Sequence, residues 1–331
     1  MNSKPAITGD ALRASVEETA GRLAGRPRPA VATLHSEPEI SFEFFPPTAT
    51  GVEHFHATLE ALDPLGADFM SVTYGAGGSS QERTLAALQA INSRCQTPAM
   101  GHLTCIGASR NSVLEVVDSY AAAGVKRILA LRGDPPAGTT EFTAHADGFD
   151  GTVELVAAIA ARGNFDLSVA AYPEKHPQAR SVAADLDHLK RKLDAGARRA
   201  ITQFFFEPDT FLSFRDRAAA AGISAPIIPG ILPVMNLPRT LAMARQCGTT
   251  VPAWLGQLFQ GLDDAPQIRQ LVAATVTAEL CTRLQDQGVH QFHFYTLNRP
   301  ELTWSICHIL GLRAAGSGNV AANLNQRIPA A

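Results

Sequence analysis

Paired cysteines, runs of basic residues and long apolar stretches are all missing from this sequence, and each absence argues against a class of protein. The 331 residues include five cysteines, which lie far apart, form no C-x-x-C pair and are odd in number: Cys95, Cys105, Cys247, Cys281 and Cys307. This pattern is typical of reduced thiols in a cytosol. No apolar stretch is long enough to span a membrane, and the N-terminus has no apolar signal segment. We therefore expect a soluble cytoplasmic protein with no membrane partner.

An excess of positive charge is missing too. The formal net charge is −3 at pH 7, and lysine and arginine form no run, so nucleic-acid binding is not expected. The chain does contain much apolar material, because 46% of its residues are hydrophobic and 18% are charged. These proportions are typical of a globular chain rather than a disordered one. The length is sufficient for one barrel-sized domain.

The sequence predicts three segments. Residues 1–37 contain an amphipathic helix from Ala11 to Leu23, followed by Gly25-Arg26-Pro27-Arg28-Pro29, which cannot be helical and which we interpret as a linker. Residues 38–313 are expected to form the main domain. Residues 314–331 are small and polar and contain glycine, so we expect a flexible tail there.

From residue 39 onward, short apolar runs rich in β-branched and aromatic residues alternate with longer segments of helical periodicity. Serine and glutamate predict capping boxes at Ser79–Glu82 and Ser112–Glu115. Five glycines just before strands are expected to end helices in the left-handed conformation: Gly66, Gly124, Gly196, Gly222 and Gly288. The apolar runs predict eight strands: Glu39–Phe45, Asp68–Tyr74, Ala99–Cys105, Arg127–Gly133, Asp166–Tyr172, Arg199–Phe206, Ile227–Pro233 and Gln291–Leu297.

Nearly continuous apolar strands separated by helices are typical of a parallel sheet that helices cover on the outside. Eight such units in about 270 residues have the size of a (β/α)8 barrel, and a doubly wound open sheet is the alternative. We predict an α/β protein that forms a (β/α)8 barrel, or TIM barrel, with an N-terminal helical extension. A barrel of this kind carries its functional site at the C-terminal ends of the strands.

One acidic residue interrupts the first predicted strand. Glu43 lies in the apolar run Ile40–Phe45, which Pro46 and Pro47 end. A buried carboxylate is costly unless it is paired or reacts, and burial favours the protonated form that a general acid needs. Glu43 is therefore either an acid at the rim of the barrel or the partner of a neighbouring Arg or Lys, and the residue alone does not decide between the two.

Polar residues also follow the other predicted strands, and each of them has a plainer interpretation. The segment Gly75–Ser80 could cradle a phosphate or form a tight turn. Asp134 could be a functional carboxylate or a turn residue, and His102 could be a packed core histidine. Two histidine pairs lack a third ligand at suitable spacing, so we interpret them as surface or packing residues and predict no metal site. These pairs are His54 with His56, and His290 with His293.

Nine stretches, in order from about residue 39 to 312, resemble bacterial methylenetetrahydrofolate reductases. They are Phe42–Pro47, Ser71–Gly75, His102–Cys105, Leu131–Asp134, Ala170–Glu174, Asp185 with Leu189–Lys192, Ala200–Phe206, Pro229–Pro233 and His293–Arg299. One such match would be weak evidence, but nine in register are highly specific. The resemblance implies a flavoprotein barrel that uses FAD to pass hydride from NADH or NADPH to 5,10-methylenetetrahydrofolate. The product would be 5-methyltetrahydrofolate, which belongs to one-carbon metabolism and methionine biosynthesis.

The resemblance also implies roles for single residues. Glu43 matches the general acid that assists opening of the five-membered ring of the folate, and Asp134 matches a carboxylate that stabilises the cationic iminium. Positions that match FAD contacts are Thr73, His102, Arg132, Gly133, Asp134, Ala170, Tyr172, His176, Asp185 and Lys192. Positions that match folate contacts are Glu43, Thr73, Asp134, Gln203, Tyr295 and Arg299, of which Arg299 would meet the glutamate tail.

Two other functions are weighed against the reductase. A pterin-binding barrel without flavin, of the methyltransferase type, would have nothing to hold the ADP half of FAD, yet Asp185 and Lys192 are present. A silent flavin-binding subunit would have lost Glu43 or Asp134, and both are in place. The apolar helix face Leu271–Leu280 could serve a homo-oligomer interface or the core.

Overall fold

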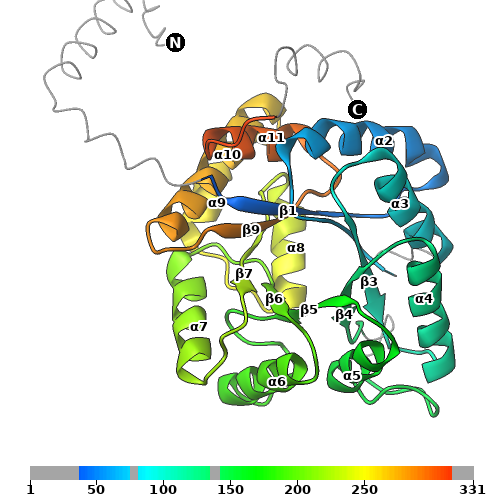
Figure 1. The fold of residues 1–331 in the computed structure, drawn as a ribbon. Helices are drawn as coiled ribbons and strands as arrows, with labels where there is room; N and C mark the ends of the chain where they lie inside the picture. The colour runs from blue at the N-terminus through cyan, green and yellow to red at the C-terminus, as the bar shows by residue number, and fades with distance from the viewer. Residues whose placement is uncertain (1–36, 75–80, 135–141, 315–331) are drawn as a thin grey trace, which may run out of the picture. The chain divides into compact units, whose positions relative to one another are not determined.

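A barrel of parallel strands surrounded by helices makes up the described part of the chain (Figure 1). The computed structural model describes residues 37–74, 81–134 and 142–314, all of which belong to the second of two compact units, Glu37–Ala331. The predicted N-terminal helix, the glycine-rich segment 75–80 and the C-terminal tail lie outside the described residues, apart from Ala314. The capping box at Ser79–Glu82 lies partly outside them. The division of the sequence into three segments stays a prediction.

The sheet closes on itself through one short segment. Among the described residues nine strands form a single sheet in the order β7-β6-β5-β4-β3-β2-β1-β9-β8. Because β7 pairs with β6 while β8 pairs with β9, residues 227–231 join the two ends of the sheet. The predicted (β/α)8 barrel is confirmed, and the open sheet is excluded. The strands are β1 Glu39–Phe44, β2 Met70–Val72, β3 Ala99–Thr104, β4 Arg127–Leu131, β5 Asp166–Ala171, β6 Arg199–Thr202, β7 Ile227–Ile228, β8 Gly230–Ile231 and β9 Gln291–Tyr295.

Pro229 divides the predicted seventh strand into β7 and β8. Proline has no N–H group, so the ladder of hydrogen bonds is interrupted at this residue. The Pro229 carbonyl still accepts a hydrogen bond from the His293 N–H at 3.0 Å, and the Gly230 N–H donates to Thr202 Oγ1 at 3.0 Å. The prediction of one continuous strand was therefore wrong, although the segment lies where the barrel needs it.

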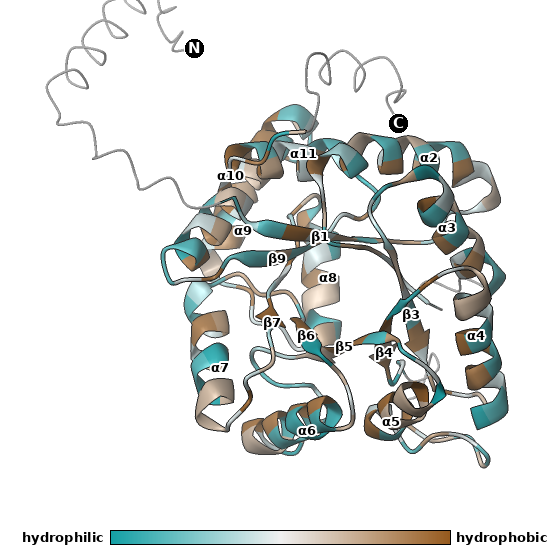
Figure 2. Ribbon diagram, viewed as in Figure 1, coloured by the Kyte–Doolittle hydropathy of each residue, from teal (hydrophilic) through white to brown (hydrophobic). Residues whose placement is uncertain are grey.

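Helices cover the outside of the barrel, and along them hydrophilic and hydrophobic residues alternate, as expected for helices with one face on a sheet (Figure 2). No helix among the described residues is long and apolar enough to cross a membrane. The helices are α2 Val52–Leu62, α3 Gln81–Arg94, α4 Arg110–Ala122, α5 Thr152–Arg162, α6 Val182–Asp194, α7 Pro208–Ala220, α8 Leu237–Cys247, α9 Ala253–Phe259, α10 Pro266–Gln285 and α11 Pro300–Ile309, with 3-10 turns at Ala49–Gly51 and Asp63–Leu65.

Helix ends follow the predicted chemistry with one correction. The predicted capping box at Ser112 is wrong, because α4 begins at Arg110 and its N-cap is Ser109, whose Oγ accepts a hydrogen bond from the Ser112 N–H at 3.2 Å. Ser112 therefore lies in the first turn of the helix. The five glycines predicted to end helices all have positive φ, between 68° and 126°. That conformation is open to glycine without steric strain.

The strands separate an outer core from an inner one. Successive residues of a strand point to opposite faces, so Phe42 and Phe44 of β1 pack outward, and the Phe44 ring contacts that of Phe55 on α2 at 6.0 Å. Ser41 and Glu43 therefore face the interior. A separate apolar cluster consists of Phe69, Met100, Leu129 and Ile201. These four residues form an apolar floor, and we use that name for them below.

Ion pairs link the strands at their N-terminal ends. Arg127 Nη1 lies 3.0 Å from Asp68 Oδ1, and Arg199 Nη2 lies 2.9 Å from Asp166 Oδ2. The Arg127 guanidinium also lies over the Phe69 ring, at 5.7 Å from its centre. The apolar floor is thus bounded on this side by charged groups, and the polar side chains of the interior lie toward the C-terminal ends of the strands.

Close packing of α4 on β3 gives a first test of the fold. A Cβ atom on Gly101 would come within 2.3 Å of the Tyr120 ring, whose hydroxyl donates to the His102 carbonyl at 2.8 Å. We expect Gly101→Ala to lower the free energy of unfolding by ~1–3 kcal/mol, measured by urea denaturation. Gly256→Ala in α9 is the control, because nothing lies within 4 Å of the added atom. Equal stability of the two variants would contradict this packing.

Candidate functional site

Glu43 lies near the C-terminal end of β1 between two imidazole rings. Its Oε2 atom is 3.6 Å from His102 Nε2 and 3.7 Å from His293 Nε2, and its side chain is 16% exposed. Among the residues that the structure describes, the ion-pair partners of Glu43 are these two histidines, not the Arg or Lys of the plainer interpretation. The carboxyl group is therefore held by neighbours that can exchange protons with it.

A layer of polar side chains surrounds this carboxyl group. Ser41 Oγ lies 2.8 Å from His293 Nδ1, and Ser71 Oγ lies 3.2 Å from His102 Nε2. The His293 ring stacks on Phe69 of the apolar floor, with ring centres 5.5 Å apart. Burial lowers the pKa of His102 to about 4, against the opposing effect of Glu43. His102 is thus neutral near pH 7, and it is both a packed histidine and a neighbour of the acid.

Strand β9 shapes the side of this layer next to Glu43. Tyr295 pairs in register with Glu43, and its hydroxyl donates to the Thr202 carbonyl at 2.7 Å. Burial, with the Glu43 charge in second place, raises the pKa of Tyr295 well above its usual range, so this phenol stays protonated. The next residues tie β1 to β9, because Thr296 Oγ1 donates to the Glu43 carbonyl at 2.7 Å and Asn298 Oδ1 accepts from the Phe45 N–H at 2.9 Å.

Two predicted positions, Thr73 after β2 and Gly133 after β4, have unusual surroundings. Thr73 Oγ1 is buried and has no hydrogen-bond partner within the described part of the chain. Gly133 has φ of 92°, and a Cβ on it would come within 2.4 Å of the Ile106 side chain. Asp134 follows and is exposed. A buried hydroxyl without a partner is unusual in a folded protein and commonly marks a place where another molecule completes the hydrogen bond.

A second group of predicted residues lies around α6. Lys192 is buried and its Nζ donates to the Ala170 carbonyl. Burial lowers the pKa of Lys192 to about 8, although Asp185 acts in the opposite direction. Asp185 Oδ2 accepts a hydrogen bond from the His176 N–H at 2.8 Å, and the His176 ring lies edge-on to Tyr172 at 4.6 Å.

The predicted residues thus form two groups, which Tyr172 connects. Burial raises the pKa of Tyr172, and Cys247, Asp134 and Asp185 add to this effect. Arg132 bonds to Gln178 and lies over the Phe142 ring at 5.0 Å.

Two of the predicted residues stand apart from these groups. Gln203 lies just after β6, where its Oε1 accepts from the Phe204 N–H at 2.9 Å. Arg299 is exposed at the start of α11, and no hydrogen bond or ion pair within the described residues joins its side chain to the other predicted residues.

Sequence reasoning missed three residues of the polar layer: Ser41, Ser71 and His293. The assignment of His293 as a surface or packing residue was incomplete, because this fully buried ring faces Glu43, whereas His290 is exposed as expected. Alternation along β1 would have placed Ser41 on the same side as Glu43. No comparable signal in the sequence pairs Ser41 with His293, which is 252 residues away.

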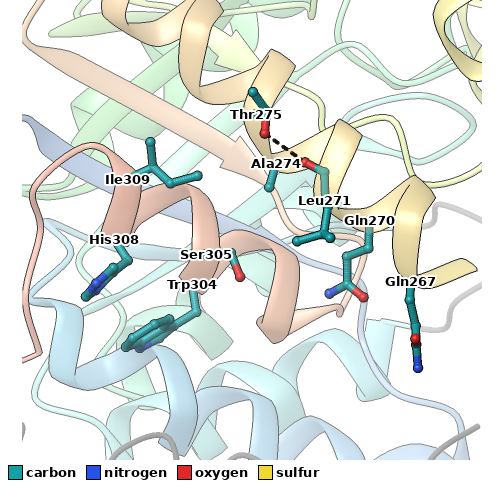
Figure 3. Close-up of a pocket in the computed structure, with 9 residues that line it drawn as sticks. All are labelled: Gln267, Gln270, Leu271, Ala274, Thr275, Trp304, Ser305, His308 and Ile309. Atoms are coloured by element: carbon teal, nitrogen blue, oxygen red, sulfur yellow. Dashed lines mark hydrogen bonds between the residues drawn. The ribbon is translucent and has the colours of Figure 1, made fainter. Parts of the chain in front are cut away.

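A surface cavity lies elsewhere, between α10 and α11 (Figure 3). Its volume is about 460 Å³, and no predicted site residue lines it. The Trp304 and His308 rings stack there at 4.9 Å, and Thr275 Oγ1 donates to the Leu271 carbonyl at 3.0 Å. The candidate site is therefore the C-terminal end of the barrel rather than this cavity. The lining residues are Gln267, Gln270, Leu271, Ala274, Thr275, Trp304, Ser305, His308 and Ile309.

Comparison with known proteins gives a consistent result. The family described as methylenetetrahydrofolate reductase matches residues 30–311. The chain is 44% identical over 285 residues to the 5,10-methylenetetrahydrofolate reductase of Pectobacterium carotovorum, covering 86% of this chain and 94% of the relative. The enzyme of Escherichia coli K12 with the same name is 43% identical, with the same coverage.

One solved structure supports the fold alone. It is an uncharacterized protein from Clostridium thermocellum, described as binding two copies of 5-methyl-5,6,7,8-tetrahydrofolic acid, and it superposes with a TM-score of 0.55 at 14% identity. The match covers 83% of this chain and 95% of the other.

The buried hydroxyl of Thr73 can be tested without any ligand. Thr73→Val removes a hydroxyl that no described residue satisfies, so we expect the free energy of unfolding of the ligand-free protein to stay equal or rise by up to about 1 kcal/mol. Thr84→Val is the matched control, because its buried Oγ1 donates to the Thr73 carbonyl at 3.0 Å and its loss should cost ~1–2 kcal/mol. Denaturant unfolding of both variants decides, and a similar loss in each would mean that the Thr73 hydroxyl is a structural group.

Proposed function

The chain belongs to the methylenetetrahydrofolate reductase family, and from this premise we propose that it uses FAD and NADH or NADPH, with Glu43 as the acid. It reduces 5,10-methylenetetrahydrofolate to 5-methyltetrahydrofolate. The observation that carries our assignment of the site is the placement of Glu43 between two buried imidazoles at the C-terminal end of β1. A preference for NADH or NADPH, a homo-oligomeric assembly and a cytoplasmic location stay predictions from the sequence.

Glu43 supplies a proton to the substrate. Opening the five-membered ring of the folate breaks a carbon–nitrogen bond, and the nitrogen that leaves needs a proton. Glu43 is mostly buried, and His102, whose Nε2 lies 3.6 Å from its carboxyl oxygen, is neutral near pH 7. The carboxyl group gives this proton to the nitrogen and becomes a carboxylate.

Asp134 stabilises the positive charge that ring opening produces. Its carboxylate is exposed at the end of β4, where a bound substrate can reach it. A fixed negative charge near a developing cation lowers the energy of the transition state without a proton transfer. Asp134 and Glu43 thus have different tasks, one as a charge and the other as a proton donor.

Three further side chains are arranged to bind the folate. The Oε1 atom of Gln203 accepts from its neighbour Phe204, so its amide NH2 group is left to donate to the pterin. The hydroxyl of Tyr295 gives its hydrogen to Thr202, so its oxygen can accept. The guanidinium of Arg299 suits the glutamate carboxylates of the substrate.

The residues around α6 and Gly133 fit FAD. Lys192 provides a cation for the diphosphate, and Thr73 provides a buried hydroxyl that has no hydrogen-bond partner within the described residues. At Gly133, packing against Ile106 leaves no room for a side chain, so this position offers backbone groups alone. Asp185 fixes the backbone of His176, and His176 in turn contacts Tyr172. His102, Arg132 and Ala170 complete the predicted set. When bound, FAD accepts hydride from the nicotinamide and passes it to the folate.

Anaerobic absorption spectroscopy tests the function and the role of Glu43 together. We expect the FAD-loaded protein to lose its flavin bands on addition of NADH or NADPH and to recover them with methylenetetrahydrofolate. Glu43→Gln should bleach at a rate within about threefold of the parent protein, whereas its recovery should slow by about 10²-fold or more, because only that step needs the acid.

The control for this experiment is Glu53→Gln, which changes an exposed glutamate of α2 and should leave both rates unaltered. Full recovery of the bands in Glu43→Gln would remove Glu43 as the acid. A protein that stays colourless after incubation with FAD would overturn the flavoenzyme and favour a pterin-binding barrel without flavin.

Lys192→Met separates cofactor binding from stability. The folded-state pKa of Lys192 is about 8, below the ordinary value of 10.5, so the charged amine destabilises the FAD-free fold below pH 8, and this cost is relieved as the pH rises toward 10.5. We expect Lys192→Met to raise the free energy of unfolding of FAD-free protein by ~1 kcal/mol or more at pH 7, with a smaller gain at pH 10. Its affinity for FAD should fall by about tenfold or more.

Titration calorimetry with FAD and denaturant unfolding measure the two effects. Lys190→Met is the control, because Lys190 is exposed on the same helix. Unchanged FAD affinity in Lys192→Met would exclude Lys192 from the diphosphate site.

A further inference from the structure

His293 lies in the site but has no part in the function proposed above. Its side chain is completely buried, and its Nδ1 atom lies 2.8 Å from Ser41 Oγ. Its Nε2 atom is buried, has no hydrogen-bond partner within the described residues, and lies 3.7 Å from Glu43 Oε2. A buried imidazole nitrogen that faces a carboxyl oxygen and nothing else calls for an explanation.

The hydrogen bonds open to Ser41 allow two forms of the neutral His293 ring. The Ser41 hydroxyl can donate to the Phe292 carbonyl at 3.4 Å and accept from His293 Nδ1, or it can donate to Nδ1 at 2.8 Å. In the first form Nε2 is unprotonated, and its lone pair is available to Glu43. In the second form an N–H group at Nε2 would face Glu43, and the two forms have opposite effects on the acid.

We propose that His293, anchored by Ser41, is a positioning residue for the acid. Its Nε2 atom accepts a hydrogen bond from the protonated carboxyl group of Glu43, and this bond keeps Glu43 protonated and correctly oriented. This inference rests on the proposed role of Glu43 as the acid. The distance of 3.7 Å is longer than a hydrogen bond. Rotation about the last side-chain torsion of glutamate, which is broad and soft, is enough to shorten it.

The surroundings of His293 hold its ring in one orientation. It stacks on Phe69 and lies edge-on to the Tyr295 ring, each at 5.5 Å. Within the described residues the titratable groups near it are Glu43 on β1, His102 on β3 and Tyr295 on β9, and both His102 and Tyr295 are neutral near pH 7.

His102 is less suited to the same task. Its Nε2 atom, which lies 3.6 Å from Glu43, is also 3.2 Å from Ser71 Oγ and so has a competing partner. His293 Nε2 has none among the described residues. When Glu43 gives its proton to the substrate nitrogen, one O–H bond breaks and one N–H bond forms, while His293 keeps the same charge throughout.

The test compares the recovery rate of the flavin bands with folate, as a function of pH, in three variants. His293→Asn retains a polar group near the Nδ1 position but has nothing that reaches Glu43. The alkaline limb of the pH–rate profile, where the recovery rate falls as the pH rises, should therefore move to lower pH by about one unit. His293→Gln places an amide oxygen near the Nε2 position and should restore most of the parent profile. His290→Asn changes an exposed histidine three residues away and should have the parent profile.

The bleaching of the flavin bands by NADH should stay within about twofold of the parent rate in all three variants, because that step needs no acid. A profile of His293→Asn that equals that of His290→Asn would overturn the proposal. A shift to higher pH would overturn it as well, because it would mean that His293 is a cation that favours the carboxylate. Equal losses in His293→Asn and His293→Gln with an unmoved limb would show only a structural role.

Infrared spectroscopy of the folate-free protein provides a readout that does not depend on turnover. The band of the protonated carboxyl group, identified by its loss in Glu43→Gln, should weaken at pH 7 in His293→Asn and in Ser41→Ala but not in His290→Asn. Ser41→Ala removes only the hydroxyl that anchors His293, and this variant replaces His293→Asn in the test if His293→Asn does not fold. An unaltered band in folded Ser41→Ala and His293→Asn would refute the pairing, whereas folate turnover by Glu43→Gln would refute the acid role alone.

Discussion

The cost of placing a carboxyl group inside a barrel governs the arrangement around it. Solvation by water does not offset this cost on the inner side, because the apolar floor of Phe69, Met100, Leu129 and Ile201 lies in the barrel interior. Hydrogen-bonding groups take the place of water. Two imidazoles lie near Glu43, Ser41 contacts the far nitrogen of His293, and Ser71 contacts the His102 nitrogen that also faces Glu43. Among the described residues the ion-pair partners of Glu43 are therefore imidazoles, and neither an arginine nor a lysine is one of them.

The backbone of β1 and β9 holds Glu43 and its neighbours in this arrangement. The register of β1 against β9 sets Ser41 beside His293 and Glu43 beside Tyr295. Just beyond, Leu297 and Asn298 both have positive φ, which is unfavourable for leucine. The hydrogen bonds of Asn298 to both the N–H and the carbonyl of Phe45 hold this turn, so the ends of the two strands move as one piece. The strain is therefore located where the acid has to be held.

Much of this could be predicted from the sequence, and the remainder could not for physical reasons. The apolar run Ile40–Phe45 and the two prolines after it placed Glu43 in a buried strand near its C-terminal end, and the glycines marked the helix ends. The cap of α4 was missed because Ser109 and Ser112 offer the same chemistry three residues apart. Pairing across strands is a matter of register, which no local pattern fixes, so His293 could not be assigned to Glu43. Which groups the residues 75–80 and 135–141 bring to the site lies outside the described part of the chain.

The two groups of site residues also have to be kept apart. A cation close to Glu43 would favour the carboxylate and remove the proton that the reaction needs, whereas a diphosphate requires a cation. Lys192 meets this requirement from α6, next to β5, and around the barrel β5 is four strands from β1 on one side and five on the other, with β7 and β8 counted separately. In a closed barrel that is the opposite wall. Between them the protonated phenols of Tyr172 and Tyr295 provide polar surface without charge. A closed sheet thus lets one rim carry both a basic site and a protonated acid. If the two groups lay on adjacent strands of an open sheet, the cation would favour the ionised form of the acid.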